Sequence, residues 1–348
     1  MSFLSQIGFE KRLQKGDSTK YYSETRCASF KIGSPSHDTS KICCLGIFGR
    51  CWVDLDKFII TIFCIVEDTL EPLPKNGNPR QRGPDPTLMD SEVMTMEIVG
   101  EFLNLCQDIQ IYRYFKRHYS HYFPALKKVH RTTFTRQASN LWMVKKRLWE
   151  HLLTQVEYDP TLAIVDSLPI HACQFARAYR CKRFGGKVAY GHDVLIRQTF
   201  YGFRLHVYLA WPGVIAGYCL APANEHESKA VPELVKKTLE ILLGDSNYWV
   251  PLLKEELAKD DINLQATYRR KSKDPHPEHS RLISRMRYRI DTVFGQLTER
   301  FNIKKVWAKD LWHLCNRLIR KILSHTVGFL LNQKLGNPPL QLERLLIA

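Results

Sequence analysis

Long apolar runs are missing from this sequence of 348 residues. The longest, from Phe58 to Val66, is followed at once by Glu67 and Asp68, and it is far shorter than the roughly 18 residues that a membrane-spanning helix needs. The N-terminal residues are polar and contain no apolar core of the kind found in signal peptides. We therefore expect a soluble chain that binds no membrane and has no secretion signal.

Paired cysteines are also absent. The ten cysteines form no CxxC pair and have no histidine at the spacing of a zinc site. This distribution argues against a zinc ribbon and against a disulfide scaffold. We expect reduced, mostly buried thiols, as in a cytoplasmic protein.

Acidic residues are few relative to basic ones. The chain has 51 Lys and Arg against 35 Asp and Glu, which gives a net charge of +16 at pH 7. In a soluble protein such an excess points first to a polyanionic partner, and nucleic acid is the leading candidate. A basic protein with no polymeric ligand is the alternative that composition alone leaves open.

The N-terminal part of the chain divides into two segments. Residues 1–52 lack periodicity and are predicted to form a poorly ordered arm. From 53 to 155 the pattern is helical, with a Pro-rich break at 72–86 and with basic residues and tyrosines interleaved between 112 and 136. A helical DNA-binding module would have this composition. The solvated face of an ordinary helical domain would have it as well.

Residues 156–334 alternate short apolar strands with helices. Strands are predicted at 162–166, in a hairpin at 200–221, at 241–245 and at 262–267, and helices at 227–239, 248–258, 279–301 and 310–334. This order predicts an α/β domain with a mixed sheet flanked by helices. Residues 335–348 are left as a tail.

Two aspartates follow apolar strands. Asp166 comes after Ala163-Ile164-Val165, and Asp245 comes after the run ILLG. A solvated surface acid is unexpected there, and acids at the ends of neighbouring strands converge easily. Either one alone could cap a helix or turn. The pair predicts a divalent metal site, because carboxylate oxygens suit Mg²⁺ or Mn²⁺.

Several stretches of this region resemble one family of enzymes. IVDSLPI, FYGFRLHVYLAWPGVI with APANEHES, LLGDSNY and YRIDTVFGQLTERF are similar to segments of the DDE transposases of small bacterial insertion sequences. The helical stretch 54–154 also resembles the N-terminal region of one such group. The resemblance implies an RNase H-like core in which two Asp and one Glu bind two Mg²⁺ (or Mn²⁺) ions, cut the ends of the element and join them to target DNA. It further implies a bacterial, cytoplasmic enzyme that acts as a homodimer on DNA.

By this resemblance the catalytic, metal-binding acids are Asp166, Asp245 and Asp291. Asp291 is one methylene shorter than the Glu of the family pattern, and Ser246-Asn247 stand where Lys-Gly is common. Because phosphoryl transfer depends largely on positioning, the shorter ligand predicts a loss of rate of about a hundredfold. A decayed or repurposed copy that binds DNA without cutting it is therefore an alternative, and a nuclease on the same core is another.

The densest basic segment leads up to Asp291. We predict DNA contacts for Arg269, Arg270, Lys271, Arg285, Arg287 and Arg289, with a solvated helix face as the alternative. His206 lies mid-strand, where it could face the metal site or the polar face of the sheet, and we favour the polar face. His226 and Glu227 are interpreted as a loop and helix start, although the family pattern there also invites a site assignment.

Overall fold

The computed structural model describes residues 54–70, 86–193, 196–235, 238–268 and 274–346. The predicted arm at 1–52 and nearly all of the Pro-rich break lie outside these residues. The helices are α1 (Leu55–Leu70), α2 (Asp90–Phe102), α3 (Asp108–His118), α4 (Arg131–Asn140), α5 (Trp142–Gln155), α6 (Val231–Leu234), α7 (Pro251–Ala258), α8 (Pro277–Gly295) and α9 (Leu311–Lys334). The strands are β1 (Asp159–His171), β2 (Ala189–Asp193), β3 (Gln198–Trp211), β4 (Val214–Pro222), β5 (Ile241–Gly244) and β6 (Asn263–Ala266).

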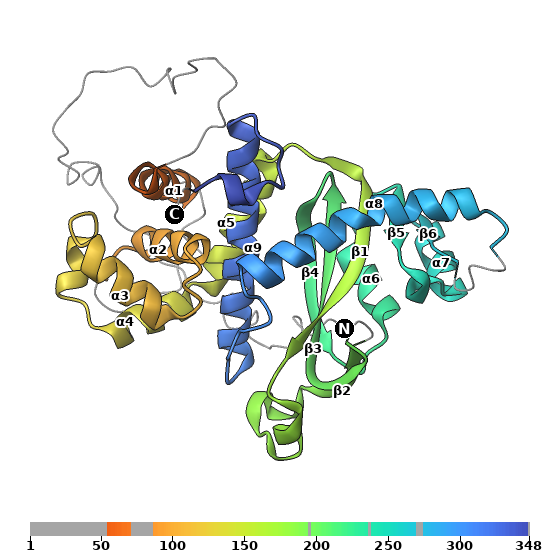
Figure 1. Ribbon diagram of the computed structural model, residues 1–348, viewed down its shortest axis with the longest axis horizontal. Helices are drawn as coiled ribbons and strands as arrows, with labels where there is room; N and C mark the ends of the chain where they lie inside the picture. Colours follow the sequence, from red (N-terminus) through yellow and green to blue (C-terminus); the bar gives the residue numbers. More distant parts are fainter. Residues whose placement is uncertain (1–53, 71–85, 194–195, 236–237, 269–273, 347–348) are drawn as a thin grey trace, which may run out of the picture. The chain divides into compact units, whose positions relative to one another are not determined.

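The helical region expected from the sequence is formed by α1 to α5 (Figure 1). Leu141 separates α4 from α5 with φ −83° and ψ 5°, so the helical pattern there forms two helices. None of the described helices is long and apolar enough to span a bilayer. The proposed boundary between a helical domain and a catalytic domain at residue 155 remains a prediction.

The six strands form one mixed sheet in the order β2-β3-β1-β5-β6, with β4 also pairing with β3. β1 is antiparallel to β3 and parallel to β5, and β5 is parallel to β6. The predicted hairpin is formed by β3 and β4, which are antiparallel neighbours. A mixed sheet flanked by helices and preceded by a helical region confirms the predicted α/β, RNase H-like fold class.

Helix α8 runs across β1, β5 and β6 (Figure 1). Its apolar stripe is buried, with Ile283 at 2%, and Ile290 and Val293 at 0% exposure, as the predicted helix at 279–301 requires. The helix expected at 227–239 is much shorter, because the backbone is already extended at Val235 (ψ 138°) and α6 ends at Leu234.

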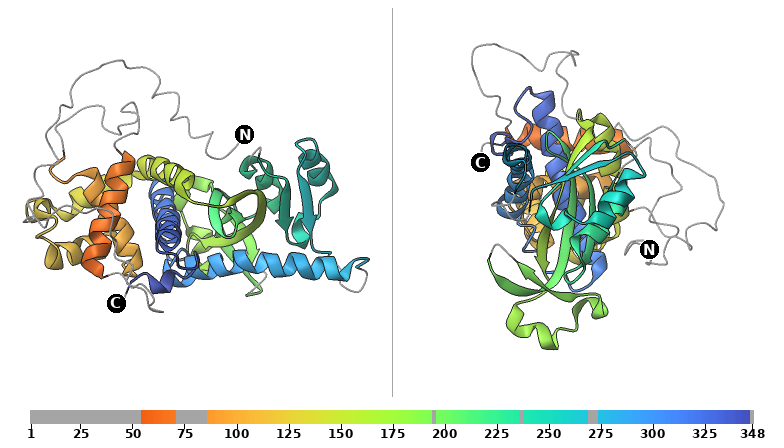
Figure 2. Two further views of the ribbon diagram at one scale, coloured as in Figure 1. Left: turned by 90° about the horizontal axis from the view of Figure 1, so that it is seen from above. Right: turned by 90° about the vertical axis from the view of Figure 1, so that its right-hand side faces the viewer.

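Helix α9 packs against α2, α4 and α5 and also contacts β4 (Figure 2). Its interface with the helical region contains a buried cluster of charges. Arg320, fully buried, donates to Glu101 Oε1 at 2.5 Å and to Asp108 Oδ1 at 2.6 Å. The cluster comprises the acids Glu97, Glu101 and Asp108 and the bases Lys145, Arg320 and Lys321. Balanced charges of this kind fix the position of α9, since each one unpaired would be costly in the interior.

The described cysteines at 64, 106, 173, 181, 219 and 315 are all free thiols, as expected. The expectation that they are mostly buried was wrong for this set. Cys64 is exposed and the other five are partly exposed.

Candidate active site

The parallel register between β1 and β5 brings the two predicted acids together. Ile164 pairs with Leu243, and Asp166 and Asp245 each follow two residues later. Asp245 comes directly after β5, as predicted. Asp166 lies inside β1 rather than at a strand end, which corrects the sequence interpretation. Pairing with β3, where Asp166 lies opposite Val207, extends β1 as far as His171, while β5 stops at Gly244.

Asp166 is largely enclosed, with 19% of its side chain exposed. Its Oδ1 accepts a hydrogen bond of 2.7 Å from the amide of Ser167, and its Oδ2 lies 2.9 Å from a guanidinium nitrogen of Arg287 on α8. Burial raises the pKa of the Asp166 carboxyl to about 7, against the opposing effect of Arg287 and with the charges of Asp245 and Glu227 adding to the rise. The electrostatic coupling shows that the two aspartates share one environment.

Asp245 caps the short helical turn Ser246–Tyr248 and accepts a hydrogen bond of 2.9 Å from the amide of Asn247. The capping role that the sequence left open is therefore real. Burial also raises the pKa of the Asp245 carboxyl, and the nearby charge of Glu227 adds to the rise. Asp245 thus caps a turn and lies beside Asp166 at the same time.

Tyr248 is a buried residue close enough to these acids to feel their charge. The residue is fully buried, and its Oη has no hydrogen-bond partner among the described residues. Burial raises the pKa of Tyr248 well above its usual value, and the charges of Asp166, Glu227 and Asp245 all act in the same direction. A buried hydroxyl near carboxylates is a polar group that a ligand held by these acids could satisfy.

Glu227 is the residue that sequence reasoning undervalued. It does begin a short helical turn, as expected. Its Oε1 also accepts hydrogen bonds from Ser167 Oγ at 2.7 Å and from Arg204 at 2.9 Å, and its Oε2 from Asn247 Nδ2 at 3.4 Å. These contacts bring the carboxylate to the edge of the Asp166–Asp245 pair. The similarity of APANEHES to the family pattern was the available signal.

The two histidines near Glu227 differ. His226 caps the turn by accepting from the amide of Ser228, as expected for a loop residue. His206 is 1% exposed, and neither ring nitrogen has a partner among the described residues. Burial lowers the pKa of His206 to about 4, although the charge of Glu227 opposes the fall. His206 is therefore a buried neutral group on the Glu227 side of the sheet, not a residue on a solvated face.

Asp291 lies apart from this cluster in the described conformation. Its position on α8 is one helical turn beyond Arg287, but its side chain is exposed and makes no polar contact with a described residue. Within the described residues, no three His, Cys, Asp or Glu side chains converge as a ready-made metal centre. The structure thus brings Asp166 and Asp245 together and places Glu227 near them through Ser167 and Asn247, whereas Asp291 makes no contact with this group.

The residues predicted to contact DNA have different outcomes. Arg269, Arg270 and Lys271 lie outside the described residues. Arg285 and Arg289 are exposed on α8, and the Arg289 guanidinium lies 5.5 Å from the centre of the Trp211 ring. Arg287 is held by Asp166. DNA contact by these residues remains a prediction.

Comparison with known families addresses the part of the chain that carries these acids. Residues 158–309 match the family model described as the transposase DDE domain. This segment is similar to the transposase DDE domain. The resemblance to DDE-type transposases is therefore confirmed, and the family implies DNA as the partner of the enzyme. No curated protein and no solved structure matches the chain.

Two carboxylates of this segment have the chemistry to hold a divalent cation. Asp166 and Asp245 offer hard oxygens, the ligands that Mg²⁺ and Mn²⁺ prefer. Burial makes the charged forms of the two aspartates costly, and a bound cation would offset that cost.

Proposed function

We propose that the chain is an insertion-sequence transposase that cuts the DNA ends of its element and joins them to target DNA in a metal-dependent reaction. One observation carries the proposal: Asp166 and Asp245 lie side by side within a transposase DDE domain, and their carboxyl pKa values are raised by burial and by neighbouring carboxylates. DNA is the substrate, and a homodimer on paired DNA ends is the expected active form.

Asp166 and Asp245 would hold Mg²⁺ or Mn²⁺, in a set completed by a third acid. Two such ions supply an activated attacking oxygen and stabilise the leaving oxygen of the phosphodiester. In the protein itself, Arg287 neutralises Asp166. From the same α8 position, its guanidinium can also contact a DNA phosphate near the cleavage site. Ser167 and Arg204 hold Glu227 in place beside the pair.

The direct test is the isosteric variant Asp166→Asn, assayed with Mn²⁺ on a DNA fragment that carries the ends of the element. We expect the parent chain to release nicked ends and form joined products, and the variant to lose both while still binding the fragment. Unchanged melting temperature would show that the variant is folded. Equal cleavage by the two proteins would refute the proposal.

The third acid can be assigned by comparing two further variants. The family resemblance implies Asp291. Glu227 is the carboxylate that accepts from Asn247, next to Asp245, and whose charge acts on Asp166. Cleavage lost in Asp291→Asn but kept in Glu227→Gln would support the family assignment, and the reverse pattern would support Glu227. The matched control is Glu225→Gln. Glu225 is an exposed residue two positions before Glu227, and its replacement removes the same single negative charge.

A catalytically decayed copy is the second candidate, favoured by Asp291 in place of Glu. If the parent does not cut and Asp291→Glu restores cutting, this copy is impaired. Hydrolysed ends without any joined product would instead favour a nuclease.

A further inference from the structure

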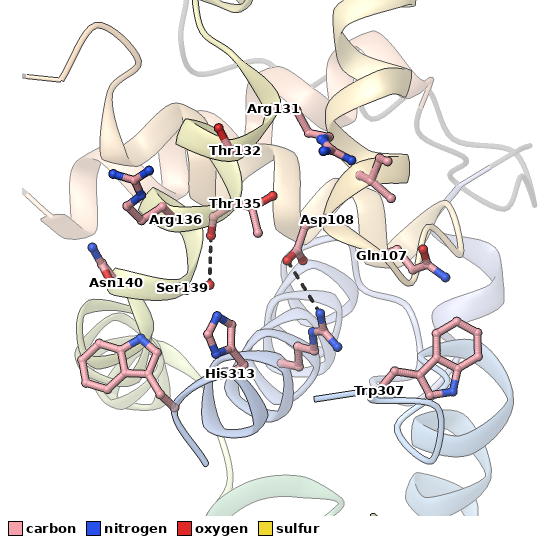
Figure 3. A pocket seen from close by; sticks show the side chains of 13 residues that line it. Gln107, Asp108, Arg131, Thr132, Thr135, Arg136, Ser139, Asn140, Trp307 and His313 are labelled. Carbon is pink, nitrogen blue, oxygen red and sulfur yellow. Dashed lines mark hydrogen bonds and ion pairs between the residues drawn. The ribbon is translucent and has the colours of Figure 1, made fainter. Parts of the chain in front are cut away.

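A cavity of about 700 Å³ lies away from the acids, between the helical region and the start of α9 (Figure 3). One side is formed by α4, which contributes Arg131, Thr132, Thr135, Arg136, Ser139 and Asn140. The other side contains Trp307, Trp312, His313 and Arg317. The size is within the usual range of ligand sites.

The cavity is positively charged. Of the described residues that line it, only Asp108 is acidic, and Arg320 neutralises that carboxylate at 2.6 Å. Arg131 and Arg136 are exposed and form no ion pair with any described residue. Two free guanidinium groups beside hydroxyl and amide side chains provide good contacts for phosphate oxygens.

Trp307 adds an aromatic surface. It lies in the segment before α9, and 66% of it is exposed. An exposed indole offers a flat apolar face that can be buried against a ligand. A flat aromatic face beside a cationic groove is the combination that binds unpaired bases and their phosphates.

A second cavity, of about 300 Å³, also has Trp307 in its lining. Its polar lining includes Arg177, Arg183 and Lys304, and its wall includes Ile170 and His171 at the end of β1. Trp307 thus lines both basic cavities, and the second one reaches the end of the strand that carries Asp166.

We propose that the two cavities and Trp307 form a track for a single-stranded segment of DNA, with phosphates against Arg131 and Arg136 and a base stacked on Trp307. The proposal rests on DNA being the substrate of the DDE domain. A single strand is favoured over a duplex because only an unpaired base can offer its face to Trp307.

The test uses the full chain and a labelled oligothymidylate of about 20 nucleotides, with binding followed by fluorescence anisotropy over a range of salt. Log K falls as log salt rises, and each phosphate contact on a single strand contributes about 0.7 to the steepness of that fall. Replacing both Arg131 and Arg136 by Ala should therefore make the slope about 1.4 less steep. The matched control replaces Arg113 and Arg117, which are exposed on α3 and do not line either cavity. Its slope should change by less than about half as much.

Trp307→Ala should weaken binding roughly fivefold or more, and Trp307→Phe should retain most of the affinity. The parent should show quenching of tryptophan fluorescence on binding, and Trp307→Phe should lose most of it. Equal salt slopes for both double variants, unchanged affinity in Trp307→Ala, or tighter binding of oligouridylate than of oligothymidylate would each overturn the track.

The result is separable from the proposed function. If the Arg131, Arg136 and Trp307 variants bind DNA like the parent while cleavage still depends on Asp166, only this inference is overturned. A parent chain that binds no DNA at all would overturn both.

Discussion

Replacing Arg320 by Met removes the central charge of the buried cluster between α9 and the helical region. The side chain is fully buried, and its guanidinium contacts Glu101, Asp108 and, at 3.3 Å, Glu97. Without the guanidinium, the carboxylates of the cluster are left with only the two lysines, Lys145 and Lys321, as partners. One of the three negative charges then stays uncompensated in the interior. Removing one partner of a buried ion pair costs about 3 to 5 kcal/mol. In a unit of this size the melting temperature should fall by on the order of 10 °C.

The pH dependence of this loss separates an electrostatic cause from a packing defect. Burial already raises the pKa of Glu97, and loss of Arg320 should raise it further. The folded variant then binds a proton more tightly than the unfolded chain, so its stability improves as the pH falls. Urea unfolding at pH 8 and pH 5 should show the deficit shrinking at the lower pH.

Arg317→Met is the matched control, since Arg317 lies one turn earlier on α9, is 21% exposed and stands 4.0 Å from Asp108. It should cost at most about 1 kcal/mol. A deficit for Arg320→Met that is no larger than this, or that is constant with pH, would refute the view that the cluster holds α9 by charge.

Two further predictions concern buried polar groups. His325 is fully buried, and burial lowers its pKa to about 4. Because the unfolded chain binds a proton at His325 below about pH 6.5, the free energy of unfolding should fall by about 3 kcal/mol by pH 4. Urea unfolding of His325→Gln should show a smaller loss of stability in acid, and an equal loss would contradict a buried neutral His325. Tyr248→Phe removes a buried hydroxyl that has no partner among the described residues, so the melting temperature in the absence of metal should stay equal or rise. The same variant should cut DNA more slowly if the hydroxyl donates to a ligand bound at the acids. A large loss of stability would contradict the prediction, because it would show that the hydroxyl has a partner in the folded chain.

The helices and the hairpin were predictable because their periodicity is local. The stripe that begins with Ile283 and Ile290 predicts the buried face of α8, and the alternation from residue 200 to 221 predicts β3 and β4. Strand β2 was missed because AYGHD offers no apolar alternation. The helix at 227–239 was overextended because its leucines and valines suit either a helix or an extended segment.

The candidate site was predictable only in part. Asp245 follows its strand as expected, but the position of Asp166 inside β1 depends on how far β3 continues to pair with it. Glu227 reaches the pair through Ser167, a contact over 60 residues of chain that depends on the β3–β4 hairpin. Such long-range contacts leave no periodic trace in the sequence. The pairing of Arg287 with Asp166 was missed for the same reason.

The register of β1 against β5 also bears on when the proposed activity can first appear. Asp166 belongs to the first strand of the sheet, whereas Asp245 becomes its neighbour only when β5 pairs in parallel with β1, on the side away from β3. A chain still being synthesised holds one acid of the pair long before it holds the other. If this pair carries the proposed cutting of DNA, a chain that ends before β5 lacks Asp245 and should not cut.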